Sequence, residues 1–452
     1  MPKKESGKIL EKTINYLFVV DIFNEGIDIP DIDTVLFLRP TESLTVFLQQ
    51  LGRGLRLAEN KECLTVLDFV GNSRPEYDFE GKFRALVGKT NTSTRKEIED
   101  DFPHLPLGCS IVLEKKAKEF ILENIKKATS LNRNQLINKI LNYKYQTTLP
   151  LSLKNFSDFY HIPLKVIYKK GNWKRLCAQA GQIADFNVIN EREIYRAINK
   201  KWLSCNSASY FQFILTLAKQ NFNIDFKTLN EQEKLMCLML HYDVWIEPGG
   251  FSTLEESIHA IGKNDVLVNE IIEIMEILID KIDYMEKDIS LPYCQPLKLH
   301  SRYTRDQILA AFGLSTFEVK SSNREGVAEN TKINTELLFI DLIKSESDFS
   351  PSTLYQDFAM SETLFHWQTQ NSARPDLGRG LSYVNHIDSG KIILLFVRER
   401  KRNEFDSTMS YVFLGDANLI EHSGYKPMNI TWKLREPMPH YLWKESAKMA
   451  VG

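Results

Sequence analysis

The stretch from Tyr16 to Arg56 constrains the fold of this chain more than any other part of its 452 residues. It contains two short apolar runs, Leu17–Val20 and Val35–Leu38, each bounded by residues that favour turns. Continuous apolar runs of this length are typical of strands that are buried on both faces of a parallel sheet. The sequence therefore predicts an α/β sheet near the start of the chain. The loop after the first strand lies at the edge where such sheets bind ligands.

A helix is expected after the second apolar run, with Thr41 or Ser43 as its cap. An apolar stripe then follows at helical spacing, at Leu44, Phe47, Leu48 and Leu51. The helix ends in Gly52-Arg53-Gly54-Leu55-Arg56, where two arginines stand three residues apart beside glycines. Charged guanidinium forks next to backbone without side chains suit a phosphate chain. The end of this helix is therefore predicted to bind phosphates.

These residues resemble the last two motifs of superfamily 2 helicases of the DEAD/DEAH type. Gly26-Ile27-Asp28-Ile29-Pro30 resembles the fifth motif, and Gln49-x-x-Gly52-Arg53-x-x-Arg56 resembles the sixth. The matching positions have fixed spacing and lie in a strand–loop–strand–helix context, which makes the resemblance specific. It implies ATP and Mg²⁺ as cofactors of the intact protein.

The resemblance also implies a role for each matching residue. Asp28 is expected to contact the ribose or a nearby water, and Gln49 to couple the nucleotide site to nucleic acid. Arg53 and Arg56 are expected to be catalytic arginine fingers that reach the γ-phosphate, with Arg56 stabilising charge in the transition state. The other cofactor-binding positions that the resemblance implies are Gly26 and Gly52.

A complete motor also needs a Gly-x-x-x-x-Gly-Lys-Ser/Thr loop and an acidic metal-binding motif. Gly88-Lys89-Thr90 does not supply the loop, because Phe83 stands where the first glycine is required. Glu99-Asp100-Asp101 lies in a charged connector rather than at the end of an apolar strand. We therefore expect the chain to begin inside the second motor lobe, to bind no cofactor stably alone, and to be inactive by itself. Its partners would include a missing N-terminal nuclease and first motor lobe.

The composition is ordinary for a soluble globular protein, with 43% hydrophobic residues, 26% charged residues and a net charge of −2. Bulk charge gives no argument for nucleic acid binding, so any DNA groove must be built locally. No apolar run reaches the roughly 18 residues that a membrane span needs. The six cysteines are scattered without a Cys-x-x-Cys pair, which argues against a metal site and a disulfide framework. A cytoplasmic protein without a membrane partner is expected.

The sequence divides into four regions, which together predict a multidomain α/β plus α plus α+β fold. Residues 1–72 are expected to be the C-terminal half of a truncated RecA-like lobe, and residues 73–108 an extended connector. Residues 109–290 have the pattern of a helical spacer. Within it, Phe156–Ala180 is a candidate helix-turn-helix-like unit whose basic residues either face DNA or belong to a structural spacer.

Residues 291–452 are expected to form a β-rich domain. The predicted strands are Leu337–Ile343, Leu381–Asn385, Ile392–Val397, Tyr411–Leu414 and Asn429–Leu434. The predicted helices near its middle and end are Ser352–His366 and Tyr441–Met449.

This last domain concentrates polar and aromatic residues between its strands. A base pulled out of a duplex needs stacking faces and a few groups that read its edge, and these residue types supply both. Trp367 and Tyr383 have a second interpretation as core residues, because aromatic residues on strands usually pack inside. The residues that we predict to contact nucleic acid are His366, Trp367, Gln368, Tyr383, Arg398 and Arg400.

A second resemblance extends from the motor motifs through Leu338-Phe339, His366-Trp367-Gln368 and Leu395-Phe396-Val397-Arg398 to Pro427-Met428-x-Ile430-Thr431-Trp432. The chain is similar to a bacterial family that joins a phospholipase-D-like nuclease, a superfamily 2 motor, a helical spacer and a C-terminal domain of unknown function. Its characterised members resemble ATP-dependent type IV restriction enzymes, which cut DNA carrying modified cytosine. The resemblance implies a C-terminal domain like the base-flipping methylcytosine readers.

The resemblance also implies duplex DNA with modified cytosine as a partner, and a dimer is one expected assembly. Two alternatives stay open. The chain can belong to a DNA-repair helicase whose C-terminal domain is a generic DNA or protein adaptor. In isolation it can also be a non-catalytic binding module.

Overall fold

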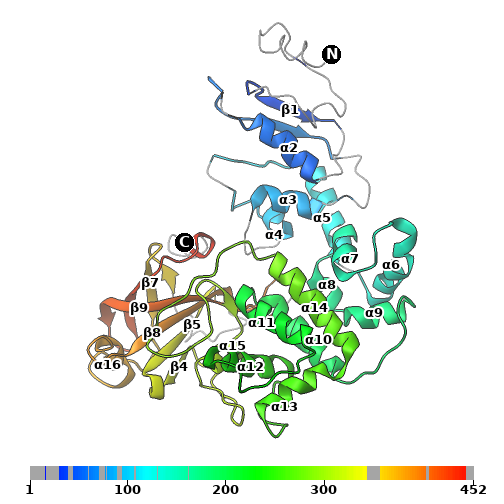
Figure 1. Cartoon of the computed structure of the whole chain (residues 1–452). Coiled ribbons are helices and arrows are strands. Elements are labelled where there is room, and N and C mark those ends of the chain that lie inside the picture. The colour runs from blue at the N-terminus through cyan, green and yellow to red at the C-terminus, as the bar shows by residue number, and fades with distance from the viewer. Residues whose placement is uncertain are drawn as a thin grey trace. The chain divides into compact units, whose positions relative to one another are not determined.

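The computed structural model describes residue 16 and residues 30–38, 44–56, 58–59, 61–70, 77, 79–88, 94–105, 108–129, 131–160, 162–343, 357–403 and 407–443. The chain divides into two compact units, Met1–Ser130 (unit 1) and Leu131–Gly452 (unit 2), whose elements are drawn in Figure 1. Each unit is described by itself below. The first predicted strand, Leu17–Val20, lies outside the described residues.

In unit 1, two short parallel strands and one helix form the predicted α/β element. Strand β1 (Thr34–Phe37) pairs with β2 (Thr65–Asp68), and helix α2 (Leu44–Gly54) connects them along the chain. Phe37 of β1 packs against Phe47 of α2, with ring centroids 5.3 Å apart. The strand predicted at Val35–Leu38 and the helix predicted after it are confirmed, and β1 lies in a parallel pair as expected, with β2 as its partner among the described residues.

The expectation that these strands are buried on both faces is wrong for the described residues. Val35 and Val66 pack against the α2 cluster, whereas Leu36 and Leu67 are exposed. Successive side chains of a strand point to opposite faces, so α2 covers one face of the pair and leaves the other open. An apolar run alone does not distinguish this half-covered strand from a fully buried one.

Three further helices complete the described part of unit 1: α3 (Phe79–Val87), α4 (Thr94–Glu99) and α5 (Lys115–Thr129). They pack around a small apolar cluster in which Phe79, Ile98 and Ile121 are fully buried. The region expected to be an extended connector therefore contains two helices among its described residues. These helices are only two to three turns long, too short to show clear periodicity in the sequence.

The first part of unit 2 is helical, as the sequence predicts. Its helices are α6 (Arg133–Gln146), α7 (Leu153–Tyr160), α8 (Leu164–Tyr168), α9 (Trp173–Gln179), α10 (Glu191–Lys200), α11 (Ala208–Lys219), α12 (Glu231–Val244), α13 (Leu254–His259), α14 (Asp265–Asp280) and α15 (Arg305–Ala311). Capping boxes at Asn132, Asn230 and Thr304 fix the starts of α6, α12 and α15, because each pairs its side chain with the helix backbone. Helix α11 packs on α14, and α12 packs on α15.

The second part of unit 2 is built on one eight-stranded sheet in the order β4-β5-β8-β9-β10-β7-β6, with β3 paired to β9. Its strands β5 and β8 are parallel, and the other pairings are antiparallel. The strands are β3 (Arg302–Tyr303), β4 (Val327–Asn330), β5 (Thr335–Ile343), β6 (Phe358–Ala359), β7 (Leu364–Gln368), β8 (Ile392–Arg400), β9 (Tyr411–Gly424) and β10 (Met428–Leu434).

The sheet of unit 2 is covered on both faces. Leu337 and Phe339 of β5 belong to the large core that the helices fill, whereas Leu338 and Ile340 belong to a second core on the opposite face. The helical part and the sheet therefore share one hydrophobic core. In Figure 1 the helices α11, α12 and α15 lie beside the sheet.

Two predicted elements of this region are wrong in type. Leu381–Asn385 was expected to be a strand, but most of it belongs to helix α16 (Gly378–Val384). Ser352–His366 was expected to be a helix, but its described part contains β6 and the start of β7. Phe365 and Trp367 are buried while their neighbours are partly exposed, which is the period of a strand. Segments this short do not reveal their type by periodicity.

Candidate functional site

Gln49 and Gly52 lie on the exposed face of α2, and Arg56 is exposed two residues after the end of this helix. Phe47 and Leu51 point into the core. Residues three positions apart share one helix face, so Gln49 and Gly52 lie together. A Cβ atom added to Gly52 would meet no atom within 4 Å, so the space beside this glycine is open. Gly26, Asp28 and the side chain of Arg53 lie outside the described residues.

Lys61 binds the end of this helix, which sequence reasoning missed. Its Nζ donates to the carbonyl oxygens of Pro30 at 2.9 Å, Arg56 at 3.1 Å and Gly54. Pro30 is the last residue of the fifth motif, so one ammonium group connects the two helicase-like motifs. A cation at this position also complements the negative end of the helix dipole. All three partners are backbone atoms, and no residue pattern marks such partners in a sequence.

Trp367 and Tyr383 of unit 2 are 6% and 0% exposed. Their rings lie 5.3 Å apart, and each lies close to Trp432, at 6.3 Å and 6.2 Å between centroids. His386 is the fourth ring of this cluster, 5.5 Å from Trp432. The two residues predicted to stack on a base are therefore packed among other aromatic rings, as their second interpretation expects. Their role in recognition stays a prediction.

Beside this aromatic cluster lies a buried ionic network centred on Glu336 of β5. The Tyr383 hydroxyl donates to Glu336 Oε1 at 2.8 Å, and Lys391 Nζ donates to Glu336 Oε2 at 2.9 Å. Lys391 also pairs with Glu329 at 2.6 Å. Burial raises the pKa of Tyr383 well above its usual value, and the neighbouring Glu336 carboxylate raises it further.

The pKa of Lys391 shows that this network is electrostatically satisfied. Burial alone would lower it, but the bonds to Glu329 and Glu336 outweigh burial and raise the pKa. Glu336 stands directly before the apolar run Leu337–Ile340 of β5, and this position alone does not mark a partner. Its partner Lys391 is 55 positions away, so the pair could not be identified from the sequence.

The remaining predicted nucleic-acid residues do not converge on one place. Arg398 is buried, donates to Asp341 Oδ2 at 3.0 Å and to the Met409 carbonyl oxygen at 3.1 Å, and is therefore occupied within the sheet. Arg400 is partly exposed at the end of β8. The strand register places Arg398 beside Asp341, and the predicted contact of both arginines with nucleic acid stays a prediction.

His366 and Gln368 point to the face of β7 opposite to Trp367, and both are partly exposed. The His366 ring lies 4.7 Å from Phe358, and burial lowers its pKa. The Gln368 amide Nε2 donates to Asn429 Oδ1 at 3.3 Å. The strand alternation thus separates these polar residues from the aromatic pair with which they were predicted to act.

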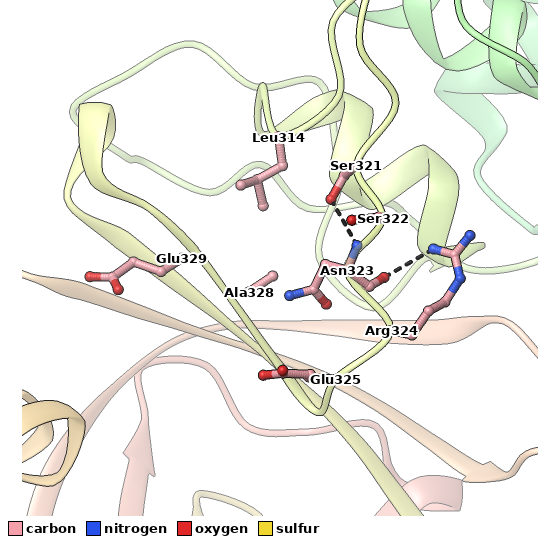
Figure 2. A pocket seen from close by; sticks show the side chains of 8 residues that line it. All are labelled: Leu314, Ser321, Ser322, Asn323, Arg324, Glu325, Ala328 and Glu329. Atoms are coloured by element: carbon pink, nitrogen blue, oxygen red, sulfur yellow. Dashed lines mark hydrogen bonds between the residues drawn. The ribbon is translucent and has the colours of Figure 1, made fainter.

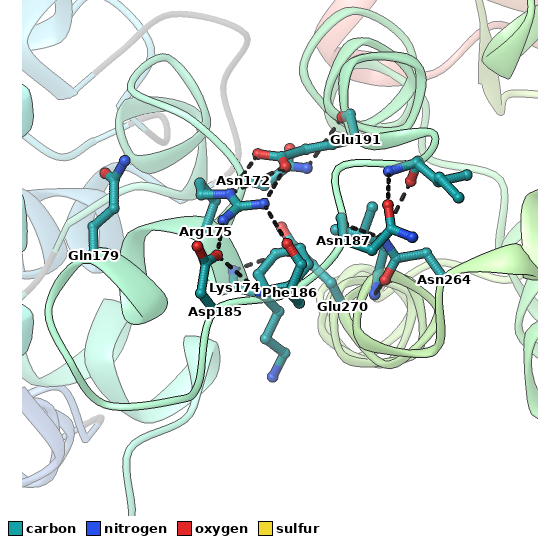
Figure 3. A network of polar contacts seen from close by, with 12 residues as sticks. Asn172, Lys174, Arg175, Gln179, Asp185, Phe186, Asn187, Glu191, Asn264 and Glu270 are labelled. Carbon is teal, nitrogen blue, oxygen red and sulfur yellow. Dashed lines mark hydrogen bonds and ion pairs between the residues drawn. The ribbon is translucent and has the colours of Figure 1, made fainter.

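In the helix-turn-helix-like unit, Lys174 and Arg175 have acidic partners within unit 2, and Figure 3 shows those of Arg175. Lys174 pairs with Glu273 at 2.9 Å, and Arg175 pairs with Glu191 at 2.6 Å. Glu270 accepts the backbone N–H groups of Trp173 at 2.7 Å and Lys174 at 2.9 Å, and so caps α9. Burial raises the pKa of Glu270 to about 7. These contacts favour the structural interpretation of this unit.

A hollow of about 540 Å³ opens beside β4, and Figure 2 shows the side chains that line it. Its lining is mostly polar, and its polar groups are bonded to one another. The Asn323 N–H donates to Ser321 Oγ at 3.3 Å, and Arg324 donates to the Asn323 carbonyl oxygen at 3.0 Å. The lining residues are Leu314, Ser321, Ser322, Asn323, Arg324, Glu325, Ala328 and Glu329.

Across residues 16–443, with the gaps given above, no helix has the length and apolar character needed to cross a membrane. In the same part of the chain, no three His, Cys, Asp or Glu side chains gather as ligands for a metal ion.

Comparison with protein families assigns two parts of the chain. Residues 1–58 match the helicase conserved C-terminal domain, and residues 297–446 match a domain of unknown function (DUF3427). The first match contains both helicase-like motifs, and the second contains the sheet of unit 2 from β3 onward. Residues 1–58 are therefore similar to a helicase C-terminal domain, and both helicase-like motifs lie within this match.

Two curated proteins are similar to short parts of the chain. A putative ATP-dependent helicase, IRC3 of Saccharomyces cerevisiae, is 48% identical over 73 residues, which are 15% of this chain and 11% of that protein. A 51.5 kDa protein of a Lactococcus phage is 37% identical over 75 residues, or 16% of each chain. The chain thus spans only a small part of these relatives.

Among solved structures, SUVH6 of Arabidopsis thaliana is 7% identical, with 57% of this chain and 42% of that chain covered and a TM-score of 0.24. A likeness at this level carries no argument about fold or function.

Proposed function

We propose that this chain is the C-terminal part of an ATP-dependent DNA translocase that acts as a modification-dependent restriction enzyme. The observation that supports it is the presence, in one chain, of a helicase C-terminal domain and the domain of unknown function at residues 297–446. In this proposal unit 1 supplies one side of a motor and unit 2 recognises DNA with modified cytosine.

The exposed face of α2 fits a nucleotide. Gly52 leaves open space for a phosphate chain, Gln49 lies on the same face of the helix, and Arg56 is exposed just after the end of the helix. In this proposal Arg53 and Arg56 hold the γ-phosphate, and Gly26 and Asp28 hold the ribose end with Mg²⁺ nearby. Bound ATP supplies the hydrolysis energy that drives translocation. The residues of this chain orient the phosphates and stabilise their charge.

The runner-up is a DNA-repair helicase in which unit 2 is a generic DNA or protein adaptor. One observation favours it: Trp367 and Tyr383 are buried, so the described conformation offers no open aromatic slot for a flipped base. The two proposals differ in one measurable property, which is whether binding depends on cytosine modification.

Binding of the full chain to matched duplexes tests the proposal. The duplexes share one sequence and differ only in carrying cytosine, 5-methylcytosine or 5-hydroxymethylcytosine. We expect tighter binding to one of the modified duplexes. Equal affinity for all three would remove the restriction proposal and leave the adaptor. The full chain is used because the helices and the sheet of unit 2 share one core.

A second measurement addresses the motor. The sequence contains no complete phosphate-binding loop, so we expect no DNA-stimulated ATP turnover by this chain alone. Turnover by the purified chain that disappears in Arg56→Ala would contradict this expectation.

A further inference from the structure

Two loops at one edge of the unit 2 sheet form an exposed surface with a tyrosine and two cations. The first loop, residues 370–379, runs from β7 into the first turn of α16, and the second, residues 424–427, is the turn from β9 to β10. We call the exposed part of both loops the tip surface. It consists of Arg374, Leu377, Tyr425 and Lys426. Leu377 is 57% exposed and Tyr425 is 54% exposed.

Direct bonds hold the two loops together. The Lys426 N–H donates to the Ala373 carbonyl oxygen at 3.1 Å, and Arg374 donates to the Tyr425 hydroxyl at 3.1 Å. At the base of the loops, the Thr369 N–H donates to the Met428 carbonyl oxygen at 2.9 Å, and the Met428 N–H donates to Thr369 Oγ1 at 2.9 Å. The tip surface is therefore one structural feature rather than two independent loops.

Glycine is required where the first loop enters α16. A Cβ atom on Gly380 would lie 2.1 Å from the Arg374 carbonyl oxygen, which no side chain can tolerate. Arg374 and Leu377 face each other across an isolated antiparallel bridge. The backbone on both sides of Arg374 is thus fixed, so its guanidinium is presented from a preformed loop.

The charge of the tip surface is opposite to that of the chain as a whole. The tip surface contains two cations, Arg374 and Lys426, against one neighbouring acid, Asp376, which gives +2 − 1 = +1 in a chain of net charge −2. Asp376 pairs with Arg374 Nε at 3.2 Å, and Arg379 interacts with Glu336 at 3.4 Å. Lys426 Nζ lies 5.7 Å from the centre of the Tyr425 ring. An exposed ring beside cations is the combination that stacks on a nucleobase and contacts the adjoining phosphates.

We propose that the tip surface is a contact site for duplex DNA, in which Tyr425 packs on a base or sugar while Arg374 and Lys426 contact phosphates. This inference rests on the proposed function, because it names the surface through which unit 2 meets DNA. Loop 370–379 connects the strand of Trp367 to the helix of Tyr383. DNA bound at the tip surface therefore lies against the loop that joins the two buried aromatic residues.

The test measures binding of a fluorescent duplex to the full chain by anisotropy at several salt concentrations. We expect Tyr425→Ala to weaken binding about tenfold, as loss of one stacking ring does. The double variant Arg374→Gln with Lys426→Gln removes two phosphate contacts. It is expected to weaken binding and to lower the slope of log affinity against log salt by about 2.

Tyr145 of α6 provides the matched control. It is 75% exposed and also has a lysine, Lys144, 5.1 Å from its ring, but it belongs to the helical part of unit 2. Tyr145→Ala is expected to leave DNA affinity unchanged. Equal affinities of Tyr145→Ala, Tyr425→Ala and the double variant would overturn the inference and leave the proposed function standing. Failure of the unaltered chain to bind any duplex would instead overturn the proposed function. If Tyr425→Ala lowers the melting temperature, the test depends on the double variant, which keeps the ring. Its weaker binding and lower salt slope would then support the inference, and unchanged binding would overturn it.

Discussion

The two sheets of this protein differ in how many of their faces are covered. In unit 1, helix α2 packs on one face of β1 and β2, and the other face exposes Leu36, Leu38, Leu67 and Phe69 by 47–64%. In unit 2, strands β5, β8 and β9 place alternate residues in two separate cores, and most of these residues are fully buried.

The residues by which the chain resembles a helicase therefore differ in exposure from the residues that stabilise its fold. Gln49, Gly52 and Arg56 are exposed, which suits residues that meet a ligand. In unit 2 the residues that the sequence marked as functional, such as Trp367 and Tyr383, contribute to packing. A motif with fixed spacing therefore predicts exposed site residues well. Polar and aromatic composition alone predicts them poorly, because the alternation of a strand can place such a residue in the core.

The largest expected effect on stability comes from replacing Trp432 in unit 2. Trp432 is fully buried among Trp367, Tyr383 and His386, so Trp432→Ala leaves a large cavity. We expect the free energy of unfolding of unit 2 to fall by about 3–5 kcal/mol. Urea unfolding followed by circular dichroism measures it, with Leu377→Ala as the exposed control. A fall in the free energy of unfolding of less than about 1 kcal/mol would contradict the conclusion that both faces of the unit 2 sheet are covered.

The sequence predicted the strands that consist of continuous apolar runs. Val35–Leu38, Leu337–Ile343 and Ile392–Val397 lie in or overlap the strands β1, β5 and β8, because each is an apolar run with few competing signals. The short segments 358–368 and 378–384 were assigned the wrong type, because two turns of helix and five residues of strand have similar patterns.

The candidate site was predictable only where its residues are neighbours along the chain. Gln49 and Gly52 share a helix face that their spacing alone determines. The partners of Lys61 are backbone carbonyl oxygens, and the partner of Glu336 is Lys391, which stands directly before β8 and 55 positions away. Such contacts depend on the tertiary fold, so neither Lys61 nor the Glu336–Lys391 pair could be identified from the sequence.

The next largest effect is a pH dependence of stability that arises from a buried carboxyl group in the helical part of unit 2. Asp243 accepts hydrogen bonds from Trp202 Nε1 and the Tyr210 hydroxyl at 2.9 Å each and from Gln307, and it is fully buried. Burial raises its pKa from 3.8 to about 6, although Lys201 and these bonds act to lower it. The folded chain therefore holds this proton up to a higher pH than the unfolded chain.

The stability of the folded chain is therefore expected to fall as the pH rises. The stability that the retained proton contributes is complete below pH 3.8 and is lost as the pH rises through about 6. Relative to Asp243→Asn, the unaltered chain should lose on the order of 1–3 kcal/mol between pH 4 and pH 7. Urea unfolding of both proteins at several pH values measures the difference. A constant difference across this range would show that Asp243 titrates normally.

A smaller effect is expected at the end of α2 in unit 1. Lys61→Met keeps the apolar stem but removes the ammonium that binds the carbonyl oxygens of Pro30, Gly54 and Arg56. We expect a loss of about 1 kcal/mol and faster amide hydrogen exchange in residues 49–56. Lys118→Met is the matched control, because Lys118 binds the Glu99 carbonyl oxygen and Asp101 elsewhere in unit 1. Unchanged exchange at the end of α2 would show that Lys61 does not hold it.

The smallest expected effect tests the open face of the unit 1 sheet directly. Leu67 points away from α2 and is 47% exposed, so Leu67→Thr removes little buried surface and keeps a branched side chain suited to a strand. The free energy of unfolding of unit 1 should change by less than about 0.5 kcal/mol. Leu51→Thr, on the covered side, should cost several times more, since Leu51 is buried against the sheet. Equal costs for the two variants would mean that another element or a second chain covers this face in solution, and the contrast between the two sheets would then disappear.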